Sequence, residues 1–285
     1  MRTVQRHEID AEFAARQAEE LHDTVVNWAL IDLDKAPAQM NEVQYLTRSV
    51  WGYRLAGDAP AALAETWRST VLAMQAGAAA FQAATRPAGT VVECRFGTET
   101  LPVRSEGPSF WTTGGEWLNA CYLALVCREK ERLDFLNSVS PDFLRDSAAG
   151  GSAAPYLYPW IQALQALWRG REDCQEHLYA AVEAIDPQGG RDRANLIAFP
   201  AMRVFEAVIA EDGAAFNDAL FEGLEWHREH WTRDGERRRS PEGFVALPLL
   251  ALACLATDLG IPVEVESEYL PGHLVRGEWV GEFPT

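Results

Sequence analysis

Apolar side chains recur at helical spacing along most of the chain. In residues 8–33 the recurring apolar positions are Ile9, Phe13, Leu21, Val25, Trp28 and Leu33. A period close to 3.6 residues predicts a helix that buries one face. The same pattern predicts further helices at residues 38–56, 60–85, 112–127, 129–137, 156–169, 172–185, 194–211, 214–231 and 242–259. The hydrophobic pattern therefore predicts an all-α fold.

Two segments depart from the helical pattern. Residues 90–104 carry β-branched side chains on both sides of Gly97-Thr98, which predicts one small β-hairpin. Near the C-terminus a short strand is predicted at residues 262–267. Residues 263–271 read VEVESEYLP, so an extended backbone would place every second side chain on one face. The carboxylates that share this face are Glu264, Glu266 and Glu268.

A degenerate layout recurs at residues 54–67, 167–183 and 208–225. Each segment ends one helix, turns through Gly with Asp or Glu, and opens the next helix. Stacked helical hairpins have this layout, so we expect a tetratricopeptide-like, irregular solenoid. The spacing is irregular and the tetratricopeptide consensus is absent, so an irregular all-α globule is the alternative.

The chain length fits a single domain. With 285 residues the chain is long enough to bury a full hydrophobic core, and we expect one domain over residues 1–285. The loop DSAAGGSAAP at residues 146–155 is the best candidate for an internal boundary. In the turn after residue 56, Asp58 is expected to cap the next helix, with Pro60 near its first turn.

The charge balance restricts the classes of partner. The chain has 25 Lys and Arg against 42 Asp and Glu, a formal net charge of −17. Such a protein is repelled by nucleic acid and by anionic membranes, and it attracts basic partners. Acidic surfaces and strands also keep a chain soluble and prevent pairing at strand edges, which is the simpler explanation.

The apolar and sulfur-containing residues favour a cytoplasmic protein with a large core. The first 20 residues are charged and carry no secretory apolar region, and the longest apolar stretch, residues 244–256, spans 13 residues. The five cysteines contain no Cys-x-x-Cys pair, so neither a disulfide framework nor a zinc knuckle is expected. Among the ten tryptophans, four are assigned to the core: Trp28, Trp51, Trp67 and Trp117.

No catalytic or cofactor-binding motif emerges. A di-metal carboxylate bundle needs Glu-x-x-His on two helices, and only Glu19-x-x-His22 fits. His227 and His230 share a helix face and could bind a metal, although a packed histidine pair is the commoner explanation. A terpene-cyclase motif, a nucleophile elbow, a phosphate-binding loop and a dinucleotide fingerprint are all absent from the sequence. We therefore expect no cofactor, no metal and no enzymatic activity.

Six long segments follow one another in a characteristic order: residues 65–81 (ETWRSTVLAMQAGAAAF), 91–102 (VVECRFGTETLP), 122–129 (YLALVCRE), 216–231 (FNDALFEGLEWHREHW), 245–260 (VALPLLALACLATDLG) and 265–285 (VESEYLPGHLVRGEWVGEFPT). In these segments the chain resembles the immunity protein 49 family, which occurs mostly in actinobacteria. The resemblance implies a cytoplasmic, all-α immunity protein of a polymorphic-toxin system. Such a protein binds and neutralises a toxin domain, and many of these toxins are nucleases with basic surfaces.

Three functions remain open at this stage. The first is non-catalytic neutralisation of a basic toxin, with Glu264, Glu266, Glu268 and Tyr269 as the expected contact residues, since a tyrosine among carboxylates is a good interface anchor. Against this, residues 269–271 could simply dock the tail onto the last helix. The second function is a metal-dependent or small-molecule helical enzyme that uses the His227/His230 helix. The third is a general helical-repeat scaffold that binds peptides.

Overall fold

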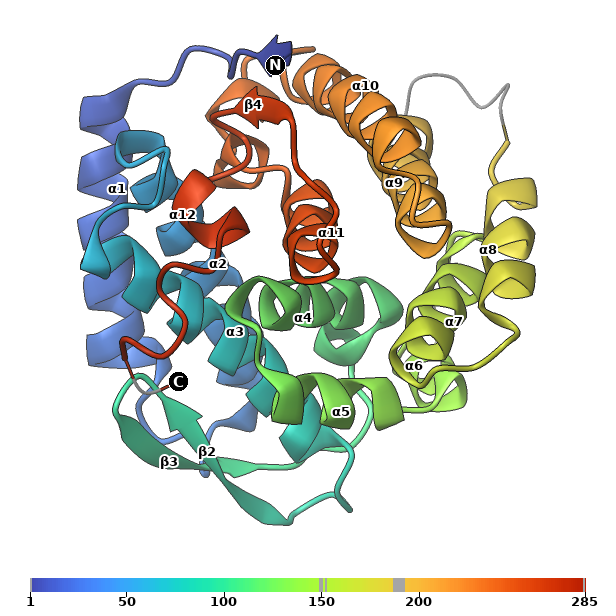
Figure 1. The fold of residues 1–285 in the computed structure, drawn as a ribbon. Helices are drawn as coiled ribbons and strands as arrows, with labels where there is room; N and C mark the ends of the chain where they lie inside the picture. Colours follow the sequence, from blue (N-terminus) through green and yellow to red (C-terminus); the bar gives the residue numbers. More distant parts are fainter. Residues whose placement is uncertain (1, 149–150, 152, 187–192, 284) are drawn as a thin grey trace.

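Helices dominate the architecture. The computed structural model describes residues 2–285 except 149–150, 152, 187–192 and 284. It is 64% helical, with few short strands, which confirms the all-α prediction. The fold is a stack of helices (Figure 1).

The elements follow one another in three groups. The N-terminal group consists of β1 (Arg2–Val4), α1 (Ala11–Thr24), the π-helix η1 (Val25–Ala29), the short 3₁₀ helix η2 (Pro37–Gln39), α2 (Met40–Gly57), α3 (Ala64–Ala84), β2 (Val91–Phe96) and β3 (Glu99–Arg104). The middle group consists of η3 (Phe110–Thr112), α4 (Gly114–Cys127), α5 (Lys130–Ser138), α6 (Pro141–Ser147), α7 (Leu157–Trp168) and α8 (Cys174–Glu183). The C-terminal group consists of the π-helix η4 (Ala194–Ala198), α9 (Phe199–Ile209), α10 (Gly213–Trp231), η5 (Arg237–Arg239), η6 (Pro241–Phe244), α11 (Leu247–Asp258), β4 (Val265–Ser267) and α12 (Gly272–Val275).

Three pairs of consecutive helices pack as hairpins, at the positions where the sequence layout recurs. They are α2–α3, α7–α8 and α9–α10. In Figure 1 these hairpins lie around α4 and α11, which occupy the middle of the molecule and contact each other. The recurring turn therefore marks real helical hairpins.

The two central helices form the main core. Every side chain of α4 from Ala120 to Cys127 is buried, and so are seven of the twelve residues of α11. The 18 residues from Pro241 to Asp258 are apolar enough by length and composition to cross a membrane, but 61% of that stretch is buried inside the protein. An apolar helix of this kind is expected at the centre of a helical core.

The turn between α2 and α3 depends on one buried carboxylate. Asp58 accepts hydrogen bonds from the backbone N–H groups of Ala62 and Leu63, at 2.9 Å each, and from the Thr66 hydroxyl at 2.7 Å. The prediction that Asp58 caps the next helix is wrong: the N-cap residue of α3 is Leu63, and Asp58 instead stabilises the turn that precedes it. α3 begins at Ala64, four residues after the predicted start, so Pro60 lies in the same turn.

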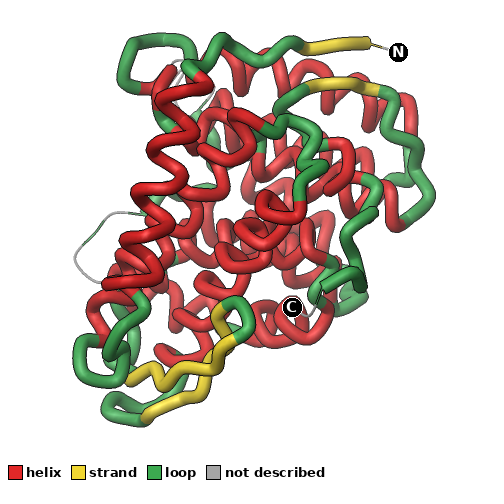
Figure 2. The backbone as a smooth tube through the Cα atoms, turned by 90° about the vertical axis from the view of Figure 1, so that its left-hand side faces the viewer, coloured by secondary structure: helices red, strands yellow, loops and turns green. Residues whose placement is uncertain are grey.

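The predicted hairpin and the predicted C-terminal strand are both present, and one strand, β1, was not predicted. β2 and β3 form the antiparallel hairpin, with Gly97 at φ +60° in its turn. β4 pairs in parallel with β1 at the N-terminus, so Arg2 lies opposite Val265. Figure 2 shows this pair and the hairpin at opposite ends of the molecule.

The prediction of one continuous helix over residues 8–33 is wrong. α1 ends at Thr24, the chain continues as the π-helix η1, and Asp32 adopts a left-handed backbone at φ +57°. Beyond Thr24 a 3.6-residue period no longer describes which side chains point inward, and Trp28 is 49% exposed instead of buried. The other three tryptophans assigned to the core are confirmed there: Trp51, Trp67 and Trp117.

The region around the predicted internal boundary is only partly described. The short helix α6 precedes it and was not predicted. Residues 149–150 and 152 of the loop at 146–155 lie outside the described residues, and the division of the chain at this loop remains a prediction.

Candidate partner-binding surfaces

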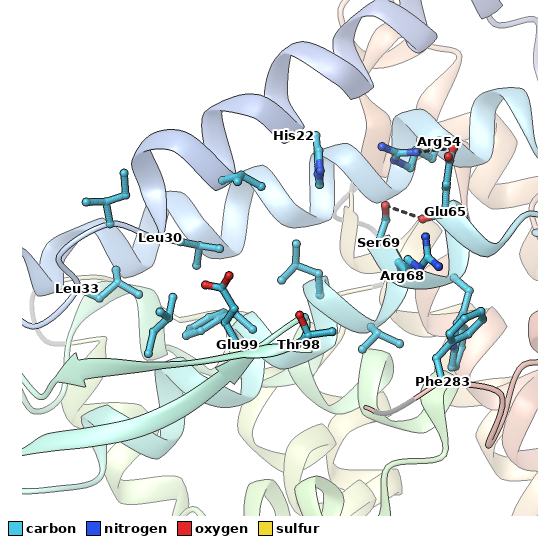
Figure 3. Close-up of a pocket in the computed structure, with 18 of the residues that line it drawn as sticks. His22, Leu30, Leu33, Arg54, Glu65, Arg68, Ser69, Thr98, Glu99 and Phe283 are labelled. Carbon is cyan, nitrogen blue, oxygen red and sulfur yellow. Dashed lines mark hydrogen bonds and ion pairs between the residues drawn. The ribbon is translucent and has the colours of Figure 1, made fainter.

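An open groove of about 1000 Å³ lies beside the N-terminal helices. One wall consists of α1, η1 and the turn that follows, and the tip of the β2–β3 hairpin forms the other wall (Figure 3). The first two turns of α3 line it between these walls, and Phe283 from the C-terminal tail lies at one end. Residues from both the N-terminal and the C-terminal part of the chain therefore line the groove.

Apolar side chains make up much of the lining. Leu72 of α3, Leu101 of β3 and Leu30 of the turn after η1 pack against a small second core beneath the groove. At the edge of the groove, Val26 and Ile31 are each 50% exposed. Exposed apolar side chains that gather in a hollow are typical of binding surfaces, whereas single ones are ordinary.

The apolar lining is surrounded by acidic side chains. The lining residues include five carboxylates against two guanidinium groups, a net charge of −3 with His22 neutral; they are Glu19, Asp32, Asp34, Glu65 and Glu99, with Arg54 and Arg68. This composition favours an amphipathic partner with basic groups.

Several of these charges hold one another in place. Arg54 of α2 forms ion pairs of 3.3 Å with Glu19 of α1 and with Glu65 of α3, and these pairs connect the three helices beside the groove. The Arg68 guanidinium lies 5.2 Å from the centre of the Phe283 ring, a cation–π distance. In the part of the chain that the structure describes, the carboxylates of Asp34 and Glu99 have no ion pair and are available to a partner.

The π-helix explains why apolar residues face outward here. In η1 the N–H of Leu30 donates to the carbonyl oxygen of Val25 at 3.0 Å, five residues earlier. The wider turn keeps Val25 and Ala29 fully buried and leaves Val26 and Trp28 half exposed. Single π-helical turns are rare and are frequent at functional sites. No residue-type motif marks a π-turn, so this surface was not predictable from the sequence.

The acidic face of the C-terminal strand is arranged as predicted. Glu264, Glu266 and Glu268 are all exposed, whereas Val265 between them is 5% exposed. Glu268 lies 3.8 Å from the Arg6 guanidinium, which is itself buried. Burial lowers the pKa of Arg6, and the charge of Glu268 acts in the opposite direction. The β2–β3 hairpin, which forms one wall of the groove, and β4 lie at opposite ends of the molecule (Figure 2). Glu268 nevertheless lies near the Arg54 side of the groove, because its partner Arg6 donates to the carbonyl oxygen of Leu55.

Tyr269 does not belong to this acidic face. It is fully buried, so the prediction that it anchors a partner on the surface is wrong for this structure. Its hydroxyl accepts a hydrogen bond from the backbone N–H of His7 at 3.1 Å and lies 2.8 Å from Nδ1 of the same residue. The Tyr269 carbonyl accepts from the N–H of Ala246 at 3.1 Å. The segment that begins at Tyr269 therefore packs beside the start of α11, as the alternative prediction stated.

The histidine pair on α10 is also part of the interior. His227 and His230 are 4% and 6% exposed, and Nε2 of His227 lies 3.1 Å from the carbonyl oxygen of Gly243. Among the described residues, no group of three His, Cys, Asp or Glu side chains is placed to hold a metal ion. His227 packs against the Tyr269 ring, with 4.8 Å between ring centres, so its observed contacts are structural.

This packing predicts a loss of stability in acid. Burial lowers the pKa of His227 from 6.5 to about 3, so the folded protein holds a neutral imidazole while the unfolded chain binds a proton below pH 6.5. The contribution of the neutral His227 imidazole to the free energy of unfolding is complete above pH 6.5 and is lost as the pH falls toward 3. From His227 alone we expect the free energy of unfolding to fall by about 2 kcal/mol between pH 7.5 and pH 5.

Urea denaturation at the two pH values measures this effect, with His227→Gln as the control. Glutamine retains an N–H donor for the Gly243 carbonyl but does not titrate, so the variant should lose less stability on acidification. An equal loss in both proteins would show that other groups carry the pH dependence.

Comparison with known proteins identifies the family. No curated protein and no solved structure matches the chain. The model of the family described as immunity protein 49 matches residues 58–274, which is most of the chain. The matched segment includes α3 and the β2–β3 hairpin on one side of the groove, and β4 at the other end of the molecule. The chain belongs to the immunity protein 49 family.

Proposed function

We propose that this immunity protein neutralises a cognate toxin domain by direct, non-catalytic binding in the cytoplasm. The family membership carries the proposal, because an immunity protein acts on a toxin partner. The excess of carboxylates supports a basic toxin, since a net charge of −17 attracts a basic surface at a distance and repels nucleic acid.

A nuclease-like toxin fits this charge best. Nucleases bind phosphate groups with Lys and Arg, and exposed carboxylates can occupy the same side chains. Exposed carboxylates of this kind are presented by Glu266 of β4 and by Glu264 and Glu268 on either side of it, together called the β4 face, near the exposed pair formed by Asp218 and Arg2. In this proposal the β4 face attracts the toxin as it approaches.

The two other functions have less support. The imidazoles of His227 and His230 are both buried, and that of His227 contacts Gly243 and Tyr269, so they offer no accessible site for a substrate. A general peptide scaffold lacks any observation that favours it over a toxin-specific protein.

Co-expression tests the proposal. The toxin-like domain encoded beside this chain is induced in a heterologous host, with and without this protein, and the two proteins are then purified together. Restored growth with a stable complex supports neutralisation by binding. Growth arrest despite soluble immunity protein, with no complex, would contradict it.

Charge reversal at β4 tests the attracting role of this face. In the variant Glu264→Lys/Glu266→Lys/Glu268→Lys we expect the association rate constant with the toxin to fall about tenfold at low salt, because steering depends on local charge. The dissociation rate constant should change little, and the difference should shrink at high salt. Stopped-flow or surface-based kinetics measure both rates.

A matched variant separates the position of the charges from their number. Asp146→Lys/Glu172→Lys/Glu176→Lys changes the net charge equally, at exposed positions near α6 and α8. An equal fall in both variants would show that only net charge matters. An unchanged association rate in the β4 variant would exclude this face.

A further inference from the structure

The groove between α1, η1, α3 and the hairpin combines exposed apolar side chains with carboxylates that form no ion pair among the described residues. Val26 and Ile31 expose half of their apolar surface in a concave site instead of on a convex surface. The lining around them has a net charge of −3, and the carboxylates of Asp34 and Glu99 lack ion pairs in the described part of the chain. An occupant must therefore offer both apolar and cationic groups.

The charge of the lining argues against a second copy of this chain and against nucleic acid. Two identical grooves brought face to face would place carboxylates such as Glu99 near one another, which costs binding energy. A phosphate backbone would meet the same carboxylates. Neither occupant matches the acidic lining.

The shape argues for a polypeptide. The volume of about 1000 Å³ lies at the upper limit of small-molecule pockets, which are usually more enclosed and bury most of their ligand. The chain's own C-terminal tail already covers one end, where Trp279 Nε1 donates to the Ala61 carbonyl at 2.7 Å and Phe283 joins the lining. The rest of the groove, between α1 and the hairpin tip, stays open (Figure 3).

We propose that this groove receives a segment of the toxin polypeptide whose apolar side chains are flanked by lysine or arginine. This inference rests on the proposed function and adds to it the place of close contact. The apolar side chains of the segment pack on Val26, Ile31 and Leu72. Its cationic groups pair with Glu99 and Asp34, whose carboxylates lie on opposite walls. The groove therefore determines how long the complex lasts, whereas the β4 face acts on the approach.

Two groove variants and two matched controls test the proposal with the purified toxin domain, inactivated by mutation, as the probe. Val26→Ser/Ile31→Ser removes the apolar edge, and Glu99→Lys reverses an unpaired charge. The controls Leu259→Ser/Tyr179→Ser and Asp146→Lys make equivalent changes at exposed positions elsewhere. All six residues are exposed, so the variants are expected to fold, and circular dichroism and thermal melting verify this.

We expect each groove variant to raise the dissociation constant at least ~10-fold, mainly through faster dissociation, and each control to change it less than ~3-fold. Protection in co-expression should weaken in the same order.

Three outcomes overturn the inference. If the wild-type protein binds the toxin and both groove variants bind equally well, the groove is excluded while the proposed function stands. If the wild-type protein neither binds nor protects, the proposed function fails and the groove inference fails with it. If light scattering shows a dimer that Val26→Ser/Ile31→Ser dissociates, the occupant is a second copy of this chain.

Discussion

Replacing Trp117 with alanine is expected to lower the free energy of unfolding by about 3–5 kcal/mol. The indole is fully buried in α4, at the centre of the helical stack, and its Nε1 donates to the Leu136 carbonyl of α5 at 2.8 Å. Alanine leaves a large cavity between two helices and removes the hydrogen bond between them. Urea denaturation followed by circular dichroism measures the loss.

Two further variants isolate the cause. Trp117→Phe retains most of the volume without the donor, and we expect it to lose about 1–2 kcal/mol. Trp28→Ala removes the same side chain from a position that is 49% exposed, where surface substitutions have small effects of about 0.5 kcal/mol. Equal losses for Trp117→Ala and Trp28→Ala would contradict the central position of α4 in the core.

Replacing Asp58 with alanine is expected to lower the free energy of unfolding by about 2–3 kcal/mol, because it leaves one buried and two partly buried donors without their acceptor. The Asp58 side chain is 7% exposed in a turn, and it accepts from Ala62, Leu63 and Thr66. The turn orients the start of α3, which carries Glu65 and other residues that line the groove. Chemical denaturation should show the loss of stability, and toxin binding should weaken with it.

Asp212 provides the matched control. It caps α10 through the N–H groups of Ala214 and Ala215, but at an exposed position where water can replace the carboxylate. Removing an exposed cap lowers the free energy of unfolding by about 1 kcal/mol. If Asp58→Ala lowers the free energy of unfolding no more than Asp212→Ala does, water reaches the donors of the α2–α3 turn. Burial then does not strengthen the hydrogen bonds that Asp58 accepts.

Local features of the sequence predicted most of the secondary structure. The helical period located the longer helices after residue 38 to within about five residues but missed the short helices α6 and α12, and the β-branched run around Gly97-Thr98 located the hairpin. The alternation at Glu264, Glu266 and Glu268 predicted an exposed acidic face, because a strand turns every second side chain to the same side. These features depend on neighbours along the chain.

The predictions that failed depend on partners far away in the sequence. The sequence neighbours of Tyr269 are typical of a protein surface. Tyr269 is buried because it contacts His7, which lies at the other end of the chain. β1 is three residues long and carries no strand signal of its own, since its pairing partner is β4. Trp28 is exposed because η1 changes the helical period over a single turn.

By itself the sequence determined the helical class, the positions of the hairpins, the acidic character and the family. Each of these follows from periodicity, composition or an extended match along the chain. The groove arises only in the tertiary structure, because its lining comes from α1, α3, the hairpin and Phe283, and these residues are spread along the sequence from Glu19 to Phe283. A concave surface arises where distant segments pack without filling the space between them, and no local pattern specifies that space.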